Sequence, residues 1–260
     1  MIQCAKDCYD LESTSMGMNP LSPWLDNVLW PSMTEASWND ADGNPVFDSE
    51  AMRLAYSAQK ELIDYQGGYA VATGWESDFG PARGSVIDPI LTGEAGFLLL
   101  PDSAISSIYN AGVEAGYAYG EDWGIARVPG KSMFTAAVYE MNAKTKNPEA
   151  SWEVMSYLNS KEAMTYLAEG EKGVGALMPR KSALDALSEK EGVCDALKEV
   201  AVLLKEADLQ SFPMSGYVNE YLGAIGNNMT AYMEGTMDMD TAVSNIQEEV
   251  QAAADAFNGK

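Results

Sequence analysis

Apolar residues return at helical spacing through much of this chain, and short apolar runs lie between those stretches. The clearest helical pattern is SEAMRLAYSAQKELIDY (residues 49–65), with Asp48 or Ser49 as its cap. Asn147 and Pro148 mark another helix start, because Asn caps a helix and Pro is favoured at the first helical position. The same spacing predicts helices at residues 105–112, 161–170, 182–206 (two helices), 218–233 and 238–257.

Three apolar runs are too short for helices and predict strands instead. They are Gly96–Leu100, Asp122–Gly130 and Phe134–Ala143. A few short strands among amphipathic helices are typical of an α/β fold. We therefore expect a helix-rich α/β architecture with a short mixed sheet.

The first predicted strand leads into a turn with polar side chains. Pro101 ends the strand because it has no N–H to donate, and Asp102 or Ser103 can cap the helix that follows. Small ligands bind where the strands of an open α/β sheet end. Asp102 is therefore either a ligand-binding residue or only a helix cap, and taken alone the stretch favours the cap.

The first 47 residues are irregular and rich in aromatic side chains. Trp24, Trp30 and Trp38 lie among three prolines. Such tryptophans either pack an edge of the core or form a rim on which sugar rings stack. The sequence leaves these two interpretations even.

Composition and net charge limit the partners and the kinds of reaction that can be expected. The net charge of −23 repels nucleic acid and anionic membranes, so neither is expected as a partner. The chain has no histidine and only three cysteines, at poor spacing for zinc, so we expect no metal site and no cofactor. Its 39 acidic residues leave open a carboxylate pair for glycoside hydrolysis. There is no signal peptide in this chain and no run long enough for a membrane span.

Four stretches, taken together and in order, resemble the extracellular solute-binding proteins of ABC importers, specifically the maltose- and oligosaccharide-binding type. They are GEAGFLLLPDSAISSI (93–108), DWGIARVPG (122–130), NPEASWEVMSYLNSKEAMTYLAEGEKGVGALMPRKSAL (147–184) and FPMSGYVNEYLGAIGNNMTAYMEGTMDMDTAVSNIQEEV (212–250). Each motif is loose alone, and their order and spacing make the resemblance specific over roughly residues 45–255.

The resemblance implies two α/β lobes that close by a hinge motion around a solute. The family is longer than this chain, which implies a C-terminal portion lacking most of the N-terminal lobe, together with any signal and lipid-anchored cysteine. On that basis residues 1–130 and 184–260 form the C-terminal lobe, and residues 131–183 are a crossover segment that would complete the other lobe. The apolar side of that segment, including Trp152, would then be exposed or covered by a second copy of the chain.

The resemblance also implies a set of ligand-binding residues. Asp102 and Ser103 would hydrogen-bond the solute, although Ser103 stands where sugar-binding members have an aromatic residue. The remaining implied positions are Tyr217, Tyr221, Trp24, Ser132 and Phe134.

These expectations describe a non-enzymatic solute-binding component of an ABC-type importer that binds a small polar solute, a carbohydrate. Its partners would be that sugar and a membrane permease, and its place would be outside the cell, lipid-anchored in the full-length form. Two alternatives remain open: a carbohydrate-active enzyme with a carboxylate pair, and an interaction fragment that binds no small molecule.

Overall fold

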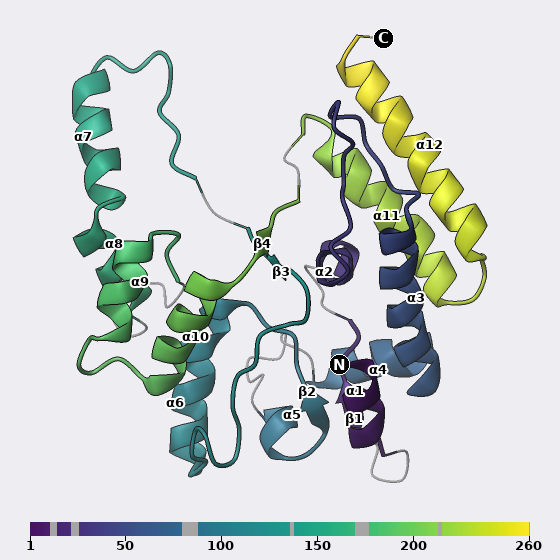
Figure 1. The fold of residues 1–260 in the computed structure, drawn as a ribbon, viewed down its shortest axis with the longest axis horizontal. Helices are drawn as coiled ribbons and strands as arrows, with labels where there is room; N and C mark the ends of the chain where they lie inside the picture. Colours follow the sequence, from purple (N-terminus) through teal and green to yellow (C-terminus); the bar gives the residue numbers. More distant parts are fainter. Residues whose placement is uncertain are drawn as a thin grey trace. The chain divides into compact units, whose positions relative to one another are not determined.

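The computed structural model describes residues 1–10, 15–21, 26–79, 88–135, 138–169, 177–212 and 215–259. The chain divides into two compact units (Figure 1). Unit 1 comprises Met1–Leu99, Val128–Phe134 and Asp208–Lys260, and unit 2 comprises Leu100–Arg127 and Thr135–Ala207. This division differs from the boundaries expected from the sequence, because residues 100–127 and 184–207 group with the middle of the chain.

Unit 1 holds two ladders of short strands and most of the long helices. Its helices are α1 (Ile2–Cys8), α2 (Asp26–Met33), α3 (Glu50–Tyr65), α4 (Tyr69–Phe79), α5 (Asp88–Leu91), α11 (Val218–Met233) and α12 (Met239–Phe257). Its strands are β1 (Met16–Met18), β2 (Ala95–Phe97), β3 (Ser132–Met133) and β4 (Leu209–Gln210). β1 pairs with β2 and β3 pairs with β4, both in parallel. Both described ladders are therefore parallel, whereas a mixed sheet was expected.

Helix α3 forms as its sequence predicts. The Ser49 hydroxyl accepts a hydrogen bond from the Met52 N–H at 3.2 Å, which satisfies one of the free donors at the helix start. The apolar positions of the helix, such as Leu62 and Ile63, are fully buried. After the helix, Gly68 donates its N–H to the Ile63 carbonyl at 2.8 Å in a left-handed backbone conformation that favours glycine.

Strand β1 lies between α1, β2 and the end of α3. A Cβ atom on Gly17 would lie 1.6 Å from the Ala5 carbonyl oxygen, so only glycine lets α1 pack this closely. The fully buried Gln66 side chain accepts from the Met18 N–H at 3.1 Å and donates to the Met18 carbonyl at 2.9 Å. The buried amide and the backbone polar groups of Met18 thus satisfy one another.

The largest core cluster of unit 1 lies around the antiparallel pair α11 and α12, which lie side by side in Figure 1. Tyr221 meets Trp38, Phe47 and Phe212 edge to face, and Trp38 meets Phe212 in the same way. The Phe47 ring packs in a tilted arrangement against Tyr56. Trp30 is buried in a second cluster with Met18 and Leu62. For Trp30 and Trp38 the structure therefore supports core packing, while Trp24 lies outside the described residues.

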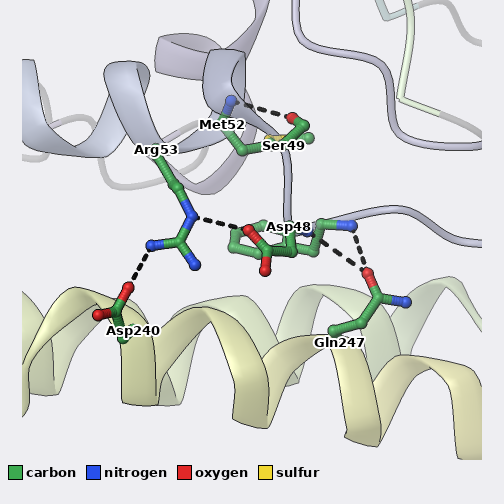
Figure 2. Close-up of polar contacts among 7 residues, drawn as sticks. Asp48, Ser49, Met52, Arg53, Asp240 and Gln247 are labelled. Atoms are coloured by element: carbon green, nitrogen blue, oxygen red, sulfur yellow. Dashed lines mark hydrogen bonds and ion pairs between the residues drawn. The ribbon is translucent and has the colours of Figure 1, made fainter.

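A short loop is fastened to α12 by polar contacts (Figure 2). The Gln247 side chain accepts from the Phe47 N–H at 2.7 Å and donates to the Pro45 carbonyl at 2.9 Å. Beside it, the Arg53 guanidinium donates to Asp48 at 2.7 Å and to Asp240 at 2.6 Å. The hydrogen bond from Arg53 lowers the pKa of the Asp48 carboxyl. These contacts join α3, the loop and α12 within unit 1.

Unit 2 is helical in its described part. It contains the 3₁₀ turn η2 (Asp102–Ala104) and the helices α6 (Ile105–Ala115), α7 (Pro148–Leu158), α8 (Lys161–Ala168), α9 (Lys181–Ser188) and α10 (Asp195–Glu206). Helix α7 begins at Pro148 as predicted, yet it has no buried residue, and Trp152 is 64% exposed. Among the described residues no helix is both long enough and apolar enough to cross a membrane.

The three predicted strands are mostly wrong. The first is shifted to β2 (Ala95–Phe97), and Leu98–Leu100 are irregular and partly buried, with Leu98 and Leu99 packed against core clusters of unit 1. Within Asp122–Gly130 the structure has only an isolated bridge between Tyr119 and Trp123. The third predicted strand, Phe134–Ala143, is irregular in its described part, and the nearby strand β3 (Ser132–Met133) ends just before it. An apolar run becomes a strand only when a partner strand lies beside it, and the sequence does not supply that information.

Candidate functional site

The polar turn after β2 is held in place by the Asp102 carboxylate. Asp102 does not cap α6, whose N-cap is Ala104 with no side-chain hydrogen bond. Instead its Oδ2 accepts from the Leu177 N–H at 2.5 Å, so the carboxylate fastens the turn to the segment that leads into α9. One carboxylate oxygen is thereby committed to the fold, and the other can still accept a hydrogen bond.

Ser103 is the most accessible polar residue of the same turn. Its side chain is exposed, and within the described part of unit 2 its hydroxyl has no hydrogen-bond partner. A serine hydroxyl both donates and accepts, as sugar hydroxyls do. Asp102 and Ser103 therefore form a small polar corner that could bind a hydroxyl-rich solute.

Ser132 and Phe134 lie on one side of the β3–β4 ladder in unit 1. The Ser132 N–H donates to the Asp208 carbonyl and the Phe134 N–H donates to the Gln210 carbonyl, both at 2.8 Å. Met133, between them, packs against the large core cluster. Successive side chains of an extended backbone point to opposite faces, so Ser132 and Phe134 share the face turned away from that core. Both are partly exposed and could reach a solute.

Tyr221 on α11 and Tyr217, the residue just before this helix, are core residues. Tyr221 is 0% exposed, and its hydroxyl lies 3.2 Å from the carbonyl oxygens of Trp38 and Val46. Burial raises the pKa of this hydroxyl, so it stays protonated and can donate to those carbonyls. Tyr217 is buried one turn earlier and packs against Phe257 with ring centroids 6.2 Å apart. In this structure neither ring offers a surface for a sugar to stack on.

The seven predicted residues therefore fall into separate groups. Asp102 and Ser103 belong to unit 2, and Ser132 and Phe134 lie together on a ladder of unit 1. Tyr217 and Tyr221 pack in the core of unit 1, and Trp24 lies outside the described residues.

Gln210 was not predicted and lies beside the Ser132–Phe134 ladder. Its Nε2 donates to the Ala36 carbonyl at 2.5 Å, and its buried Oε1 has no hydrogen-bond partner among the described residues. A buried acceptor without a partner is uncommon and suits a water or a ligand hydroxyl. The sequence does not reveal this glutamine as a candidate, because its amide is buried only once the chain has folded.

An aromatic group in unit 2 was also missed. Tyr119 lies between Tyr109 and Trp123, with ring centroids 6.1 Å and 4.9 Å away, and its hydroxyl donates to Glu199 at 2.6 Å. Burial, and then the Glu199 carboxylate, raise the pKa of Tyr119. The sequence feature that could have predicted this group is the four-residue spacing of Tyr119 and Trp123 beside glycines.

The described residues show no metal centre: no group of three or more His, Cys, Asp or Glu side chains is arranged to hold an ion. A comparison with protein-family models and a comparison with curated proteins each find no match for the chain. Solved structures do match, and they match in fold.

The sugar-binding protein MalE from the phytopathogen Xanthomonas citri has a TM-score of 0.70 and 16% identity, over 89% of this chain and 56% of its own. This chain has the fold of a MalE-type binding protein. The maltose/maltodextrin-binding domain MalE from Bdellovibrio bacteriovorus, bound to maltotriose, has a TM-score of 0.62 and 20% identity, over 100% of this chain and 65% of its own. Maltose-bound MalE3 from T. maritima has a TM-score of 0.61 and 20% identity, over 87% of this chain and 56% of its own.

The helix-rich, periplasmic-binding-protein-like fold expected from the sequence is therefore confirmed. The chain spans 56–65% of the length of these MalE neighbours, which agrees with a partial binding-protein fold. At identities of 16–20% the likeness establishes the fold.

Proposed function

We propose that this protein binds a small carbohydrate without chemical change and serves as the solute-binding component of an ABC-type importer. The observation that carries the proposal is the fold likeness to a sugar-binding protein over 89% of the chain. The sequence motifs, which follow the family's order from residue 93 to residue 250, support the same assignment. Binding by closure of a ligand cleft is part of the proposal.

The proposed contacts come from the partly exposed polar and aromatic residues. Ser103 and the free oxygen of Asp102 would hydrogen-bond sugar hydroxyls in unit 2, because both groups match hydroxyl chemistry. Ser132 and Phe134 would contribute a hydroxyl and an apolar ring from the ladder in unit 1. An anionic solute is disfavoured, because the chain carries −23 and these four residues include one carboxylate and no basic group.

Residues 131–183 keep their proposed role as a crossover segment. The exposed Trp152 on α7 supports it, since an amphipathic helix with no buried residue has an apolar face that normally contacts another surface. The partners we propose are a membrane permease and, through this segment, a second copy of the chain. An extracellular or cell-surface location, lipid-anchored in the full-length form, follows from the same assignment.

Calorimetry with the purified chain tests the proposal. We expect saturable binding of maltose or maltotriose, and no binding of a polyamine or a tripeptide. If none of the sugars binds, the proposal is contradicted.

A matched pair of serine variants tests the polar corner. Ser103→Ala should weaken sugar binding roughly two- to twelve-fold, the equivalent of one hydrogen bond of about 0.5–1.5 kcal/mol. Ser107→Ala makes the same change at an exposed position one turn further along, on α6, and should leave the affinity unchanged. Equal affinities for the two variants would remove Ser103 from the site.

A further inference from the structure

A groove between α8 and α9 in unit 2 has the features of a binding site, and none of its residues belongs to the corner described above. Its volume is about 610 Å³, within the range of small-molecule sites. It is lined by Lys161, Glu162, Thr165, Tyr166, Glu169, Ala186 and Lys190.

The two walls of this groove are fixed at both ends. At one end the Arg180 side chain donates to the Asn159 carbonyl at 2.8 Å, which joins the start of α9 to the turn before α8. At the other end Lys190, just after α9, forms an ion pair with Glu169, just after α8. Ser160 also caps α8 by accepting from the Ala163 N–H at 3.1 Å. The groove is therefore shaped before any ligand arrives, which lowers the entropy cost of binding.

Its lining follows from helical spacing. Lys161 and Thr165 lie one turn apart on α8, with Glu169 just after its end, and Glu162 and Tyr166 form the adjacent row. Thr165 is buried and its hydroxyl donates to the Lys161 carbonyl at 2.7 Å, so it closes the floor. From α9 only the small side chain of Ala186 enters the lining, which leaves room above it.

The chemistry of the groove favours a neutral ring that carries hydroxyls. Tyr166 is 52% exposed, so its ring offers a flat apolar face on one wall. Two lysines and two glutamates lie around it, and their charges cancel, although the whole chain carries −23. A charged ligand would leave one of these groups unbalanced, and a wholly apolar ligand would strip water from them without giving hydrogen bonds.

We propose that the α8–α9 groove is a second carbohydrate site, which binds a pyranose ring against Tyr166 with its hydroxyls bonded to Lys161, Glu162 and the Glu169–Lys190 pair. Ammonium groups donate and carboxylates accept, and a sugar hydroxyl can do both. The inference goes beyond the proposed transport function and does not depend on it, because it needs only the described residues of unit 2.

Saturation-transfer NMR on maltotriose, titrated against the full chain, tests this site. Tyr166→Ala should weaken binding at the groove by roughly ten-fold, near the upper end of what one stacked aromatic ring contributes. Tyr157→Ala is the matched control, since Tyr157 is an equally exposed tyrosine (58%) on α7 outside the groove, and it should leave the titration unchanged. Ala186→Phe should block the groove by filling it, without removing any proposed contact.

The outcomes separate this site from the proposed corner. In a chain carrying Ser103→Ala, maltotriose binding that persists and disappears with Tyr166→Ala supports the groove, even if the transport function is wrong. The inference is overturned if Tyr166→Ala and Ala186→Phe both bind maltotriose like the parent, or if the parent shows no saturable maltotriose signal. Binding of glycylglycine in place of maltotriose would also overturn it, since the groove would then take a zwitterion.

Discussion

Gln247→Leu is the sharpest test of how unit 1 is held together. The Gln247 amide joins the loop at Pro45–Phe47 to the middle of α12, 200 residues later in the chain (Figure 2). Leucine has nearly the same size and helix propensity as glutamine, so the change removes the polar contacts and little else.

The expected loss follows from the two shorter of the three hydrogen bonds of Gln247; the third, from the Asp48 N–H, is 3.5 Å long. Gln247 accepts from the Phe47 N–H at 2.7 Å and donates to the Pro45 carbonyl at 2.9 Å. Each neutral hydrogen bond contributes about 0.5–1.5 kcal/mol, so the variant should lower the free energy of unfolding by roughly 1–3 kcal/mol. The upper end is expected if water cannot reach the Phe47 N–H, because the Phe47 residue is fully buried.

Urea denaturation followed by circular dichroism gives the measurement, with hydrogen exchange at the Phe47 amide as a local readout. Gln251→Leu is the control, one turn further along α12. Gln251 donates only to Asp255 of its own helix at 2.9 Å, so its replacement should change stability by less than about 0.5 kcal/mol.

The reasoning fails if the two leucine variants unfold at the same urea concentration. It also fails if Phe47 exchanges no faster in Gln247→Leu than in the parent. Either result would mean that the loop is held by the packing of Phe47 and not by the amide of Gln247.

Four further changes test other features of the structure. Tyr221→Phe should cost about 0.5–1.5 kcal/mol of stability, because it removes the hydrogen bond that the buried hydroxyl donates, while the Trp38 carbonyl still accepts from the Val46 N–H; sugar affinity should not change. Arg53→Met should cost less than about 1 kcal/mol, and the cost should shrink in high salt, because both ion pairs are near the surface. Glu76→Gln should stabilise the protein at pH 7 and not at pH 3. Burial raises the pKa of Glu76 above its ordinary 4.5, although the hydrogen bond from Asn19 opposes this shift. The native carboxyl therefore ionises at higher pH than the unfolded one, and the stability of the native state falls as the pH rises past 4.5. Trp152→Ser should reduce self-association in sedimentation velocity without lowering the unfolding midpoint, since Trp152 is exposed.

Each of these expectations has an outcome that contradicts it. A Tyr221→Phe variant of parental stability but weaker sugar binding would make Tyr221 a ligand residue after all. The Arg53 argument is refuted if the cost of Arg53→Met does not depend on salt. The Glu76 argument is refuted if Glu76→Gln has the same effect at both pH values, and the Trp152 argument if Trp152→Ser sediments like the parent.

The helices could be predicted from the sequence because their signals are local. Ser49 and Asp238 each cap the helix that the pattern places after them, and the Asp238 carboxylate accepts from the Thr241 N–H at 2.7 Å. The strands could not be predicted, because a strand depends on a partner far away in the chain. β1 and β2 are separated by more than 70 residues, and Leu98–Leu100 have the apolar character of a strand without a partner.

The site was harder to predict than the fold, although one signal was available. In α11 the positions of Tyr221, Ile225 and Met229 recur every four residues, and all three are buried. Helical spacing alone places Tyr221 on the apolar face of the helix, whereas the family resemblance places it near a ligand. The polar corner could be anticipated because a turn after a strand is exposed. The bond from Leu177 to Asp102 spans 75 residues, and the sequence could not show it.

In helix α7 the local sequence determines that the helix forms, and it does not determine what the helix packs against. Its start at Asn147-Pro148 is encoded locally, and the helix forms, but none of its residues is buried; the family resemblance implied an apolar side that is exposed or covered by a second copy of the chain. A tryptophan that loses its exposed surface to a partner, roughly 100–160 Å² for a ring that is 64% exposed, would gain about 2–4 kcal/mol at 25 cal/mol per Å². That gain exists only if a partner surface covers the ring. Trp152→Ser should therefore leave the isolated chain as stable as before and weaken only its association. If α7 is solvent-exposed in the functional protein, the same substitution should change neither stability nor association.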